Sequence, residues 1–303
     1  MNMGPTLQRL YDCQIEQTPK LKDSIDKRIK ATEAGDLAFL DGLADMVIRL
    51  AGGELARFCK DYGWICDTIL REEIHFRRNG AYRLSRFEDA VAEVYSRPEV
   101  MAPYMNGLLM TQVWWPNHTR SVEFLKNGFL PRCRDGYRML EIGPGHGLFM
   151  YFPAIDPRCS HLEGWDLSET SIEATRESLS NLGVGGKAAL KQQDLFDAAS
   201  YAGGFDALIF SEVLEHLDRP KEALEALREL LSAEGKIYIH MPINAPAPDH
   251  LFNLDSPEDV SAFVQSAGFR VIDSEAAPML GYTLERALKM QLTISCLVIA
   301  ERA

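Results

Sequence analysis

The stretch MLEIGPGHG, Met139–Gly147, joins a short apolar segment to a glycine-rich turn. Gly143, Gly145 and Gly147 alternate with other residues, and Glu141 lies two positions before the first of them. Glycine permits positive φ and lets the backbone approach a ligand closely. A dinucleotide site typically shows G-x-G-x-x-G at such a turn, and a carboxylate at Glu141 would oppose a pyrophosphate. The pattern therefore favours a ligand that carries a positive charge.

Acidic residues also end the next two expected strands. The segment HLEGWD ends in Asp166, which can accept hydrogen bonds from both hydroxyls of a ribose. Asp194 in QQDLF can accept from an adenine amino group, with Leu195 beside the ring. Either aspartate alone could be a turn or helix-cap residue. Three features after three consecutive strands indicate a cationic ligand that contains a nucleoside, such as S-adenosylmethionine.

Strands and helices alternate after residue 136, which predicts a doubly wound parallel sheet with ligands at the carboxyl ends of its strands. The expected strands are Arg138–Ile142, His161–Asp166, Ala188–Gln193, Phe205–Phe210, Lys236–Met241, Phe269–Ser274 and Thr293–Glu301, and the expected helices are Glu169–Leu182, Pro220–Leu231 and Pro257–Gly268. The loop Pro242–Phe252 then follows a strand end and is expected either to face the substrate or to serve only as a crossover.

Residues 1–130 are expected to be mostly helical and to form a separate domain, with 131–303 as the cofactor-binding catalytic domain. Apolar residues recur at helical spacing in Leu37, Leu40, Leu43, Ala44 and Val47. Asn79-Gly80 within His75–Ser85 predicts a tight hairpin, so that the region would be winged-helix-like. Because its net charge is only −1, a dimerisation or substrate-cap module is favoured over a DNA-binding one.

The segments LEIGPGHG, GWDLS, QQDLF, FDALIFSEVLEHLDRP and LSAEGKIYIHMP, within Arg138–Gly268, together resemble a class I S-adenosylmethionine-dependent methyltransferase. The resemblance implies a seven-stranded sheet whose last strand is antiparallel. It implies that the glycine loop holds the methionine part, Asp166-Leu167 the ribose and Asp194-Leu195 the adenine, and that Ser211 and Glu212 line the cofactor and substrate site. The N-terminal helices loosely resemble the dimerisation domain of small-molecule O-methyltransferases.

The segment SEVLEH, Ser211–His216, has three interpretations. His216 can serve as a general base, because an imidazole with an ordinary pKa near ~6.5 can remove a proton at neutral pH. His118 is a second candidate, presented by the N-terminal region. Alternatively Glu212, Glu215 and His216 hold a metal ion, with His240 and His250 able to complete the site, since the pattern resembles the metal-binding segment of some catechol-type and RNA-end methyltransferases. The third interpretation is structural, with these residues capping the helix and packing the wall of the site. A segment without a metal ion is favoured, with His216 as the first candidate for the base.

Composition excludes several classes of partner. Residues 131–303 carry 15 basic and 26 acidic residues, a net charge of −11 that disfavours a nucleic-acid substrate. The six irregularly spaced cysteines indicate neither a disulfide framework nor a zinc site. Because no signal-peptide core or membrane-length apolar run is present, a cytoplasmic protein without a membrane partner is expected.

The sequence thus predicts an S-adenosylmethionine-dependent methyltransferase of a small metabolite, with O-methylation ahead of N- or C-methylation. Rival interpretations are an NAD-dependent oxidoreductase and a ligand-sensing winged-helix regulator. Trp114 and Trp115 suggest more apolar surface than a monomer needs, so a homodimer through the N-terminal region is expected.

Overall fold

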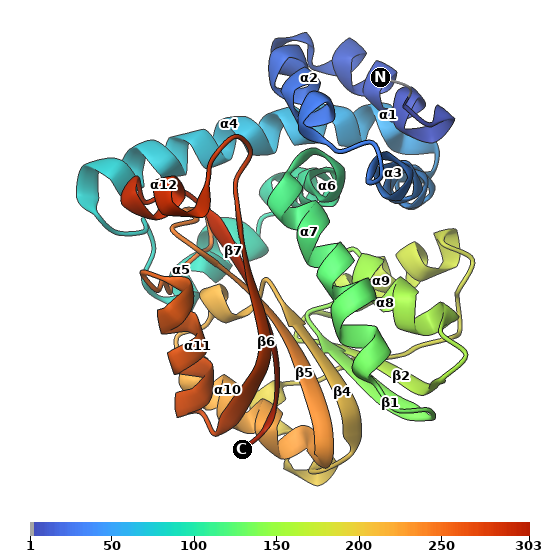
Figure 1. The fold of residues 1–303 in the computed structure, drawn as a ribbon, viewed down its shortest axis with the longest axis vertical. Helices are drawn as coiled ribbons and strands as arrows, with labels where there is room; N and C mark the ends of the chain where they lie inside the picture. Colours follow the sequence, from blue (N-terminus) through green and yellow to red (C-terminus); the bar gives the residue numbers. More distant parts are fainter. Residues whose placement is uncertain (1–2) are drawn as a thin grey trace.

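The computed structural model describes residues 3–303 and contains a seven-stranded sheet in the order β3-β2-β1-β4-β5-β7-β6 (Figure 1). Strands β1 to β5 pair in parallel, whereas β7 runs antiparallel to both of its neighbours. The expected doubly wound sheet with an antiparallel last strand is therefore confirmed. The strands are Tyr137–Ile142 (β1), Cys159–Asp166 (β2), Ala189–Gln192 (β3), Phe205–Ser211 (β4), Leu231–Ile243 (β5), Phe269–Pro278 (β6) and Ile294–Arg302 (β7).

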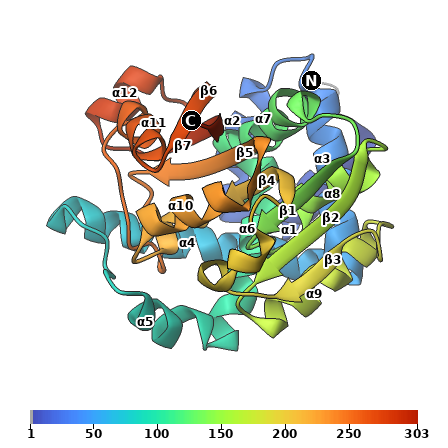
Figure 2. The ribbon, with the colours of Figure 1, turned by 90° about the horizontal axis from the view of Figure 1, so that it is seen from below.

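Both faces of the sheet are covered, which explains why its central strands contain continuous apolar runs such as Ala207–Phe210. In β4, Ala207 and Ile209 belong to one hydrophobic core, while Leu208 and Phe210 belong to the other. Successive side chains of a strand point to opposite faces, so a continuous apolar run supplies two cores. Helices flank the sheet on each side (Figure 2). The helices of this part are Leu148–Ile155 (α8), Glu169–Asn181 (α9), Pro220–Leu230 (α10), Pro257–Ser266 (α11) and Leu284–Lys289 (α12).

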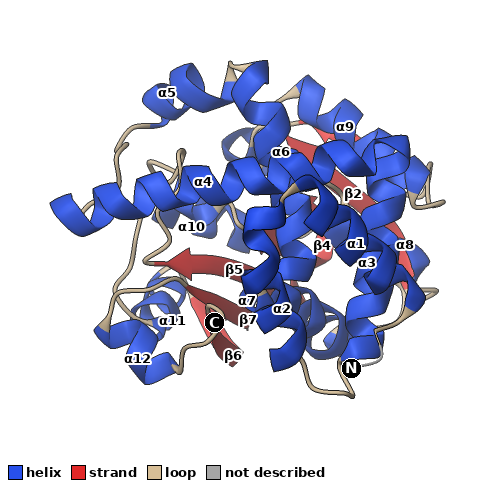
Figure 3. Ribbon diagram, turned by 90° about the horizontal axis from the view of Figure 1, so that it is seen from above, coloured by secondary structure: helices blue, strands red, loops and turns tan. Residues whose placement is uncertain are grey.

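The N-terminal helices gather at one end of the sheet and over one of its faces (Figures 1 and 3). The stripe expected on α3 is confirmed, because Leu40, Leu43, Ala44 and Val47 are buried and Leu37 is half-buried against the same core. Side chains of this region share a continuous core with Met139 and Tyr238 of the sheet. The division into domains at residue 130 stays a prediction. These helices are Pro5–Gln17 (α1), Lys22–Ala31 (α2), Leu37–Ala51 (α3), Leu55–Asn79 (α4), Phe87–Ala90 (α5), Pro98–Trp114 (α6) and Pro116–Phe124 (α7).

The hairpin expected at residues 75–85 is wrong. Helix α4 continues to Asn79, and Gly80 ends it in a left-handed conformation with φ of 71°. The Gly80 N–H donates to Phe76 O at 2.7 Å, as in a helix C-cap. Within residues 3–130, the structure describes helices and connecting turns but no strand, so the wing of the winged-helix interpretation does not form.

The two tryptophans offered as a reason for dimerisation lie inside the monomer. Trp114 is buried and its indole N–H donates to Gln14 Oε1 at 3.1 Å. Trp115 is half-buried and donates to the Tyr62 hydroxyl, also at 3.1 Å. That reason for a dimer is therefore wrong, and both side chains stabilise the packing of the N-terminal helices. Among the described residues, no helix is both long enough and apolar enough to span a membrane.

Candidate functional site

The glycine-rich turn between β1 and α8 depends on glycine at each alternate position. Gly143, Gly145 and Gly147 have φ of 65°, 51° and 71°, conformations that side chains bearing a Cβ rarely adopt. The turn is held from α9, where Thr175 Oγ1 donates to Gly145 O at 2.8 Å. Met105 of α6 lies against it, because a Cβ added at Gly145 would come within 3.2 Å of Met105 Cε. The N-terminal region thus packs directly on this turn.

Glu141, near the end of β1, is a buried carboxylate without an ion pair or hydrogen bond at Oε2 among the described residues. Burial raises the pKa of its carboxyl group well above the usual 4.5. An unpaired carboxylate in such a place costs free energy unless a cation reaches it. This arrangement fits a ligand with an ammonium group beside the glycine-rich turn.

Glu141→Gln is expected to stabilise the cofactor-free protein at pH 8 by about 1–3 kcal/mol, because it removes the burial of an unpaired charge. Since the folded-state pKa of Glu141 is raised, its carboxyl group destabilises the fold only as pH rises above the ordinary value of 4.5. The gain should therefore shrink toward pH 4. Urea denaturation at the two pH values measures it, and equal stability at pH 8 would contradict the interpretation.

The two aspartates expected to hold the nucleoside follow β2 and β3. Asp166 Oδ1 accepts from the Ser168 N–H at 2.8 Å, and burial raises the pKa of this carboxyl group although that hydrogen bond opposes the rise. Asp194 caps a short helical turn, since its Oδ1 accepts from the Phe196 N–H at 2.8 Å. Leu195 is buried and Leu167 is largely exposed. Each aspartate keeps a second carboxylate oxygen, so a capping role does not exclude a ligand.

Glu212 lies directly after β4 in a strained conformation with φ of 54°. Its Oε1 is 2.8 Å from His240 Nε2 of β5, although the pair is not aligned as a hydrogen bond. Burial opposes ionisation of Glu212, but the nearby imidazoles, above all His240, bring its pKa to about 2. Strain of this kind concentrates at functional sites. Ser211 Oγ lies 3.3 Å from His240 Nδ1, so the end of β4 is tied to β5.

His118 on α7 reaches the same place from the N-terminal region. Its ring packs edge-on against that of His240, with centroids 6.0 Å apart, and its Nδ1 lies 2.8 Å from Thr111 Oγ1. Burial lowers its pKa to about 4, so the imidazole is neutral at physiological pH. A neutral imidazole held in this way can accept a proton only weakly, and it is better suited to line a site than to act as its base.

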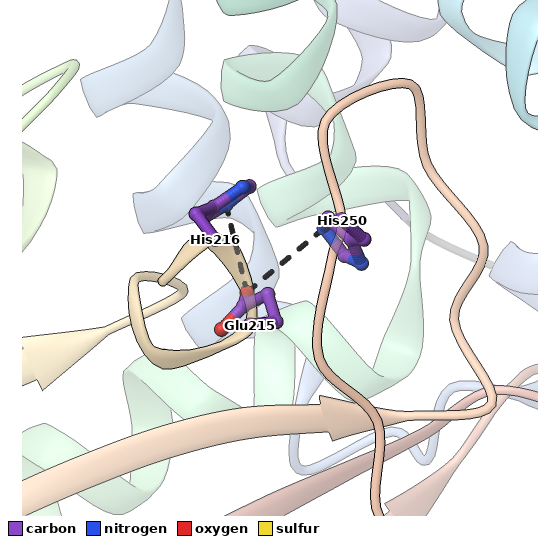
Figure 4. A group of neighbouring side chains, drawn as sticks. All are labelled: Glu215, His216 and His250. Atoms are coloured by element: carbon purple, nitrogen blue, oxygen red, sulfur yellow. Dashed lines mark ion pairs between the residues drawn. The ribbon is translucent and has the colours of Figure 1, made fainter. Parts of the chain in front are cut away.

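Glu215, His216 and His250 converge at the ends of β4 and β5 (Figure 4). Glu215 and His216 belong to the turn Leu214–His216, whereas His250 comes from the loop after β5. The Glu215 carboxylate is fully buried and neither of its oxygens has a hydrogen-bond partner. Burial, together with the charge of Glu212, raises its pKa well above 4.5. Glu212, which the sequence grouped with Glu215 and His216, instead faces His240.

The sequence patterns did not predict several of the contacts that His216 and its neighbours make. His216 Nδ1 lies 3.2 Å from the Tyr95 hydroxyl and 3.4 Å from Asp249 Oδ2, and Asp249 Oδ1 accepts from the Tyr104 hydroxyl at 2.8 Å. Tyr82 donates to Asn253 and accepts from the Ala245 N–H. Only the placement of the loop after β5, at a strand carboxyl end, pointed toward this group. Three tyrosines of the N-terminal region thus cover the ends of β4 and β5.

The chain matches the family model described as a methyltransferase domain over residues 118–274, more than half of its length. It belongs to this family of methyltransferases. The matched part is a class I S-adenosylmethionine-dependent methyltransferase domain, as the turn after β1, the acids after β2 and β3 and the sheet order had indicated. The NAD-dependent interpretation of the glycine-rich turn is therefore wrong. The orphaned Glu141 carboxylate fits the ammonium of this cofactor, and the positive-φ glycines allow its close approach.

Curated relatives resemble the chain over part of their length. It is 25% identical over 158 residues to a ubiquinone biosynthesis O-methyltransferase of Xanthomonas axonopodis pv. citri, covering 46% of this chain and 64% of that protein. It is 29% identical over 103 residues to an uncharacterized Synechococcus protein, covering 34% of this chain and 24% of that one. The matches thus span less than two thirds of either relative.

Solved structures share the fold over most of the chain. The methyltransferase SibL in its apo form has a TM-score of 0.56 at 14% identity, covering 88% of this chain and 76% of that one. The mitomycin 7-O-methyltransferase MmcR has a TM-score of 0.53 at 14% identity, covering 86% and 75%. Coverage this wide extends the likeness of fold to much of the N-terminal helical region.

Proposed function

We propose that this enzyme transfers a methyl group from S-adenosylmethionine to a hydroxyl of a small metabolite, and that His216 activates the acceptor. The observation that carries the proposal is the group at the ends of β4 and β5, where His216 stands beside a buried, unpartnered carboxylate. In a doubly wound fold ligands bind at this edge of the sheet. His118 and Glu212 line the same edge and are proposed to position the acceptor.

The transfer needs alignment more than covalent chemistry. The acceptor oxygen attacks the methyl carbon in line with the sulfonium, the carbon–sulfur bond breaks, and its electron pair stays on sulfur to leave S-adenosylhomocysteine. The hydroxyl proton must leave the oxygen as the new bond forms. Holding the two reactants in one line supplies much of the acceleration. The orphaned Glu141, the glycine-rich turn, Asp166-Leu167 and Asp194-Leu195 are proposed to hold the cofactor for this attack.

A small acceptor is supported by the covering of the site. Tyr82, Tyr95 and Tyr104 of the N-terminal region bond to residues of the loops at the carboxyl ends of β4 and β5. A polymer lying across this edge would have to displace them. The strongly acidic residues 131–303 also disfavour a phosphate backbone. O-methylation is favoured over N- or C-methylation because His216 offers proton removal, which a hydroxyl requires, and because O-methyltransferases occur among the relatives.

The acceptor can be sought directly. The purified enzyme is incubated with a metabolite extract and cofactor carrying a ¹³C-labelled methyl group. We expect a labelled methoxy signal in the carbon spectrum of the products, whereas label on nitrogen or carbon would overturn O-methylation. S-adenosylhomocysteine added in excess should suppress the signal, because it occupies the same site.

A homodimer through the N-terminal region is proposed from exposed apolar residues on α4. Leu70 and Ile74 lie one helical turn apart and are 58% and 42% exposed. Leu70→Glu combined with Ile74→Glu is expected to turn a dimer into a monomer in light scattering at micromolar concentration. Lys60→Glu on the same helix is the matched control and should leave the dimer intact. A monomeric unmodified protein would refute the proposal.

A further inference from the structure

We propose that Glu215, His216 and His250 form a binding site for a divalent ion of the first transition series. Each residue offers one ligand atom, and the three atoms lie within 4.8 Å of one another (Figure 4). No cofactor or substrate contact so far described uses both the Glu215 carboxylate and His250. The binding of the ion stands on these residues alone, and only its role in catalysis rests on the proposed function.

The spacing of the ligand atoms suits a single ion. Glu215 Oε1 lies 3.8 Å from His216 Nε2 and 4.0 Å from His250 Nε2. Atoms bound about 2.0–2.2 Å from one ion lie roughly 3–4 Å from each other, so only a small contraction is needed. Neither Glu215 oxygen has a hydrogen-bond partner among the described residues, although its side chain is fully buried. A bound cation would compensate that charge.

His216 is oriented as a metal ligand commonly is. Its Nδ1 faces Asp249, at 3.4 Å from Oδ2 and 3.2 Å from the backbone oxygen, and this leaves Nε2 directed toward Glu215. Ligating histidines usually donate their second ring N–H to a carboxylate or carbonyl oxygen, which fixes the tautomer. Asp249 is itself held by the Tyr104 hydroxyl at 2.8 Å. Asp249 and Tyr104 are therefore positioning residues for this site.

Backbone hydrogen bonds hold the two segments of the site together without an ion. The Leu251 and Phe252 N–H groups both donate to Glu215 O, at 2.8 and 3.0 Å. His250 immediately precedes this pair, so the turn after β4 and the loop after β5 are fastened at the point where the ligands meet. A site whose ligand residues are already held in place loses less conformational entropy when an ion binds.

The donor set selects the class of ion. Two imidazole nitrogens and one carboxylate suit Zn²⁺, Mn²⁺ or Fe²⁺ and leave coordination positions open, whereas Mg²⁺ prefers oxygen ligands. An open position can accept the acceptor hydroxyl. An oxygen bound to such an ion loses its proton more readily, and that proton passes to water before the oxygen attacks the methyl carbon. In this role His216 activates the acceptor through the ion instead of taking the proton itself.

Isothermal titration of the chelator-treated full-length protein tests the site without any acceptor. We expect one equivalent of Mn²⁺ or Zn²⁺ to bind and Mg²⁺ to bind at least tenfold more weakly. Glu215→Gln and His250→Asn should each weaken the binding of Mn²⁺ by at least tenfold. The control is His161→Asn, because His161 also pairs with a glutamate, Glu163 at 2.6 Å, but lies near the opposite end of β2. This variant should bind as the unmodified protein does.

Absence of binding, or unchanged binding in both site variants, would overturn the proposal. Titration of S-adenosylhomocysteine into the same variants separates this failure from failure of the proposed function. If S-adenosylhomocysteine binds and labelled methyl reaches the acceptor while Mn²⁺ and Zn²⁺ do not bind, only the ion site is wrong. If a variant fails to bind either ligand, circular dichroism shows whether it has unfolded. Tyr104→Phe then tests the site indirectly, because it removes the hydrogen bond that holds Asp249 beside His216. That variant should weaken Mn²⁺ binding, and Glu212→Gln should weaken it less than Glu215→Gln does.

Discussion

Turnover of His216→Ala is expected to fall by about 10²–10⁴-fold, while the affinity for S-adenosylhomocysteine stays nearly unchanged. We expect the loss because His216, which lies 3.8 Å from the buried Glu215 carboxylate, is proposed to act on the acceptor and not to bind the cofactor. The measurement is the rate of methoxy formation with the acceptor found in the extract experiment, together with titration of S-adenosylhomocysteine.

A chelator separates the two ways in which His216 can act. If the imidazole holds an ion, EDTA abolishes activity of the unmodified enzyme, Mn²⁺ restores it, and Glu215→Gln is as damaging as His216→Ala. If the imidazole takes the proton itself, EDTA has no effect and Glu215→Gln is less damaging than His216→Ala. His161→Asn is again the control and should keep full activity. Near-normal turnover in His216→Ala, insensitive to EDTA, would contradict both roles.

Asp166→Ala is expected to weaken S-adenosylhomocysteine binding by at least tenfold. The substitution would remove the two charge-assisted hydrogen bonds that Asp166 is proposed to accept from the ribose hydroxyls, each worth roughly 1.5–3 kcal/mol. Asp166 is suited to this role because it ends β2, where its Oδ1 is held by the Ser168 N–H at 2.8 Å. Isothermal titration at fixed salt gives the ratio of dissociation constants.

Two further variants show whether the weaker binding comes from the missing side chain or from a loss of local structure. Asp166→Asn retains an oxygen for the Ser168 N–H but lacks the negative charge, so it should also bind weakly while keeping the thermal stability of the unmodified protein. Glu169→Ala is the control, because Glu169 is a neighbouring acidic residue on the first turn of α9, and this variant should leave the affinity unchanged. Unchanged affinity in Asp166→Ala would show that the ribose lies elsewhere.

Much of the sheet could be predicted because its signals are local. A strand buried on both faces needs a continuous apolar run, which β4 has at 207–210, and the glycines after β1 occupy conformations that other residues rarely adopt. The same reasoning failed at Asn79-Gly80, because a hairpin turn and a helix C-cap both require positive φ at glycine. Only the packing of α4 along its length decided between them.

The candidate site shows a similar division. Glu215 and His216 are neighbours in sequence, and their place after an apolar strand already indicated the edge of the sheet where ligands bind. Their third partner could not be chosen from sequence, because His240 and His250 both follow or end the next strand. The structure places His240 against Glu212 and His250 against Glu215.

The sequence by itself determined the class of the fold and its cofactor, and it predicted the edge of the sheet proposed to carry the chemistry, since each depends on residue types that recur at the ends of consecutive strands. Tertiary structure alone decided which side chains meet there. Tyr95 and Tyr104 come from the N-terminal helices, and Asp249 and His250 from the loop after β5. Contacts between segments so far apart in the chain arise from the packing of helices on the sheet, for which no local spacing of residues carries a signal.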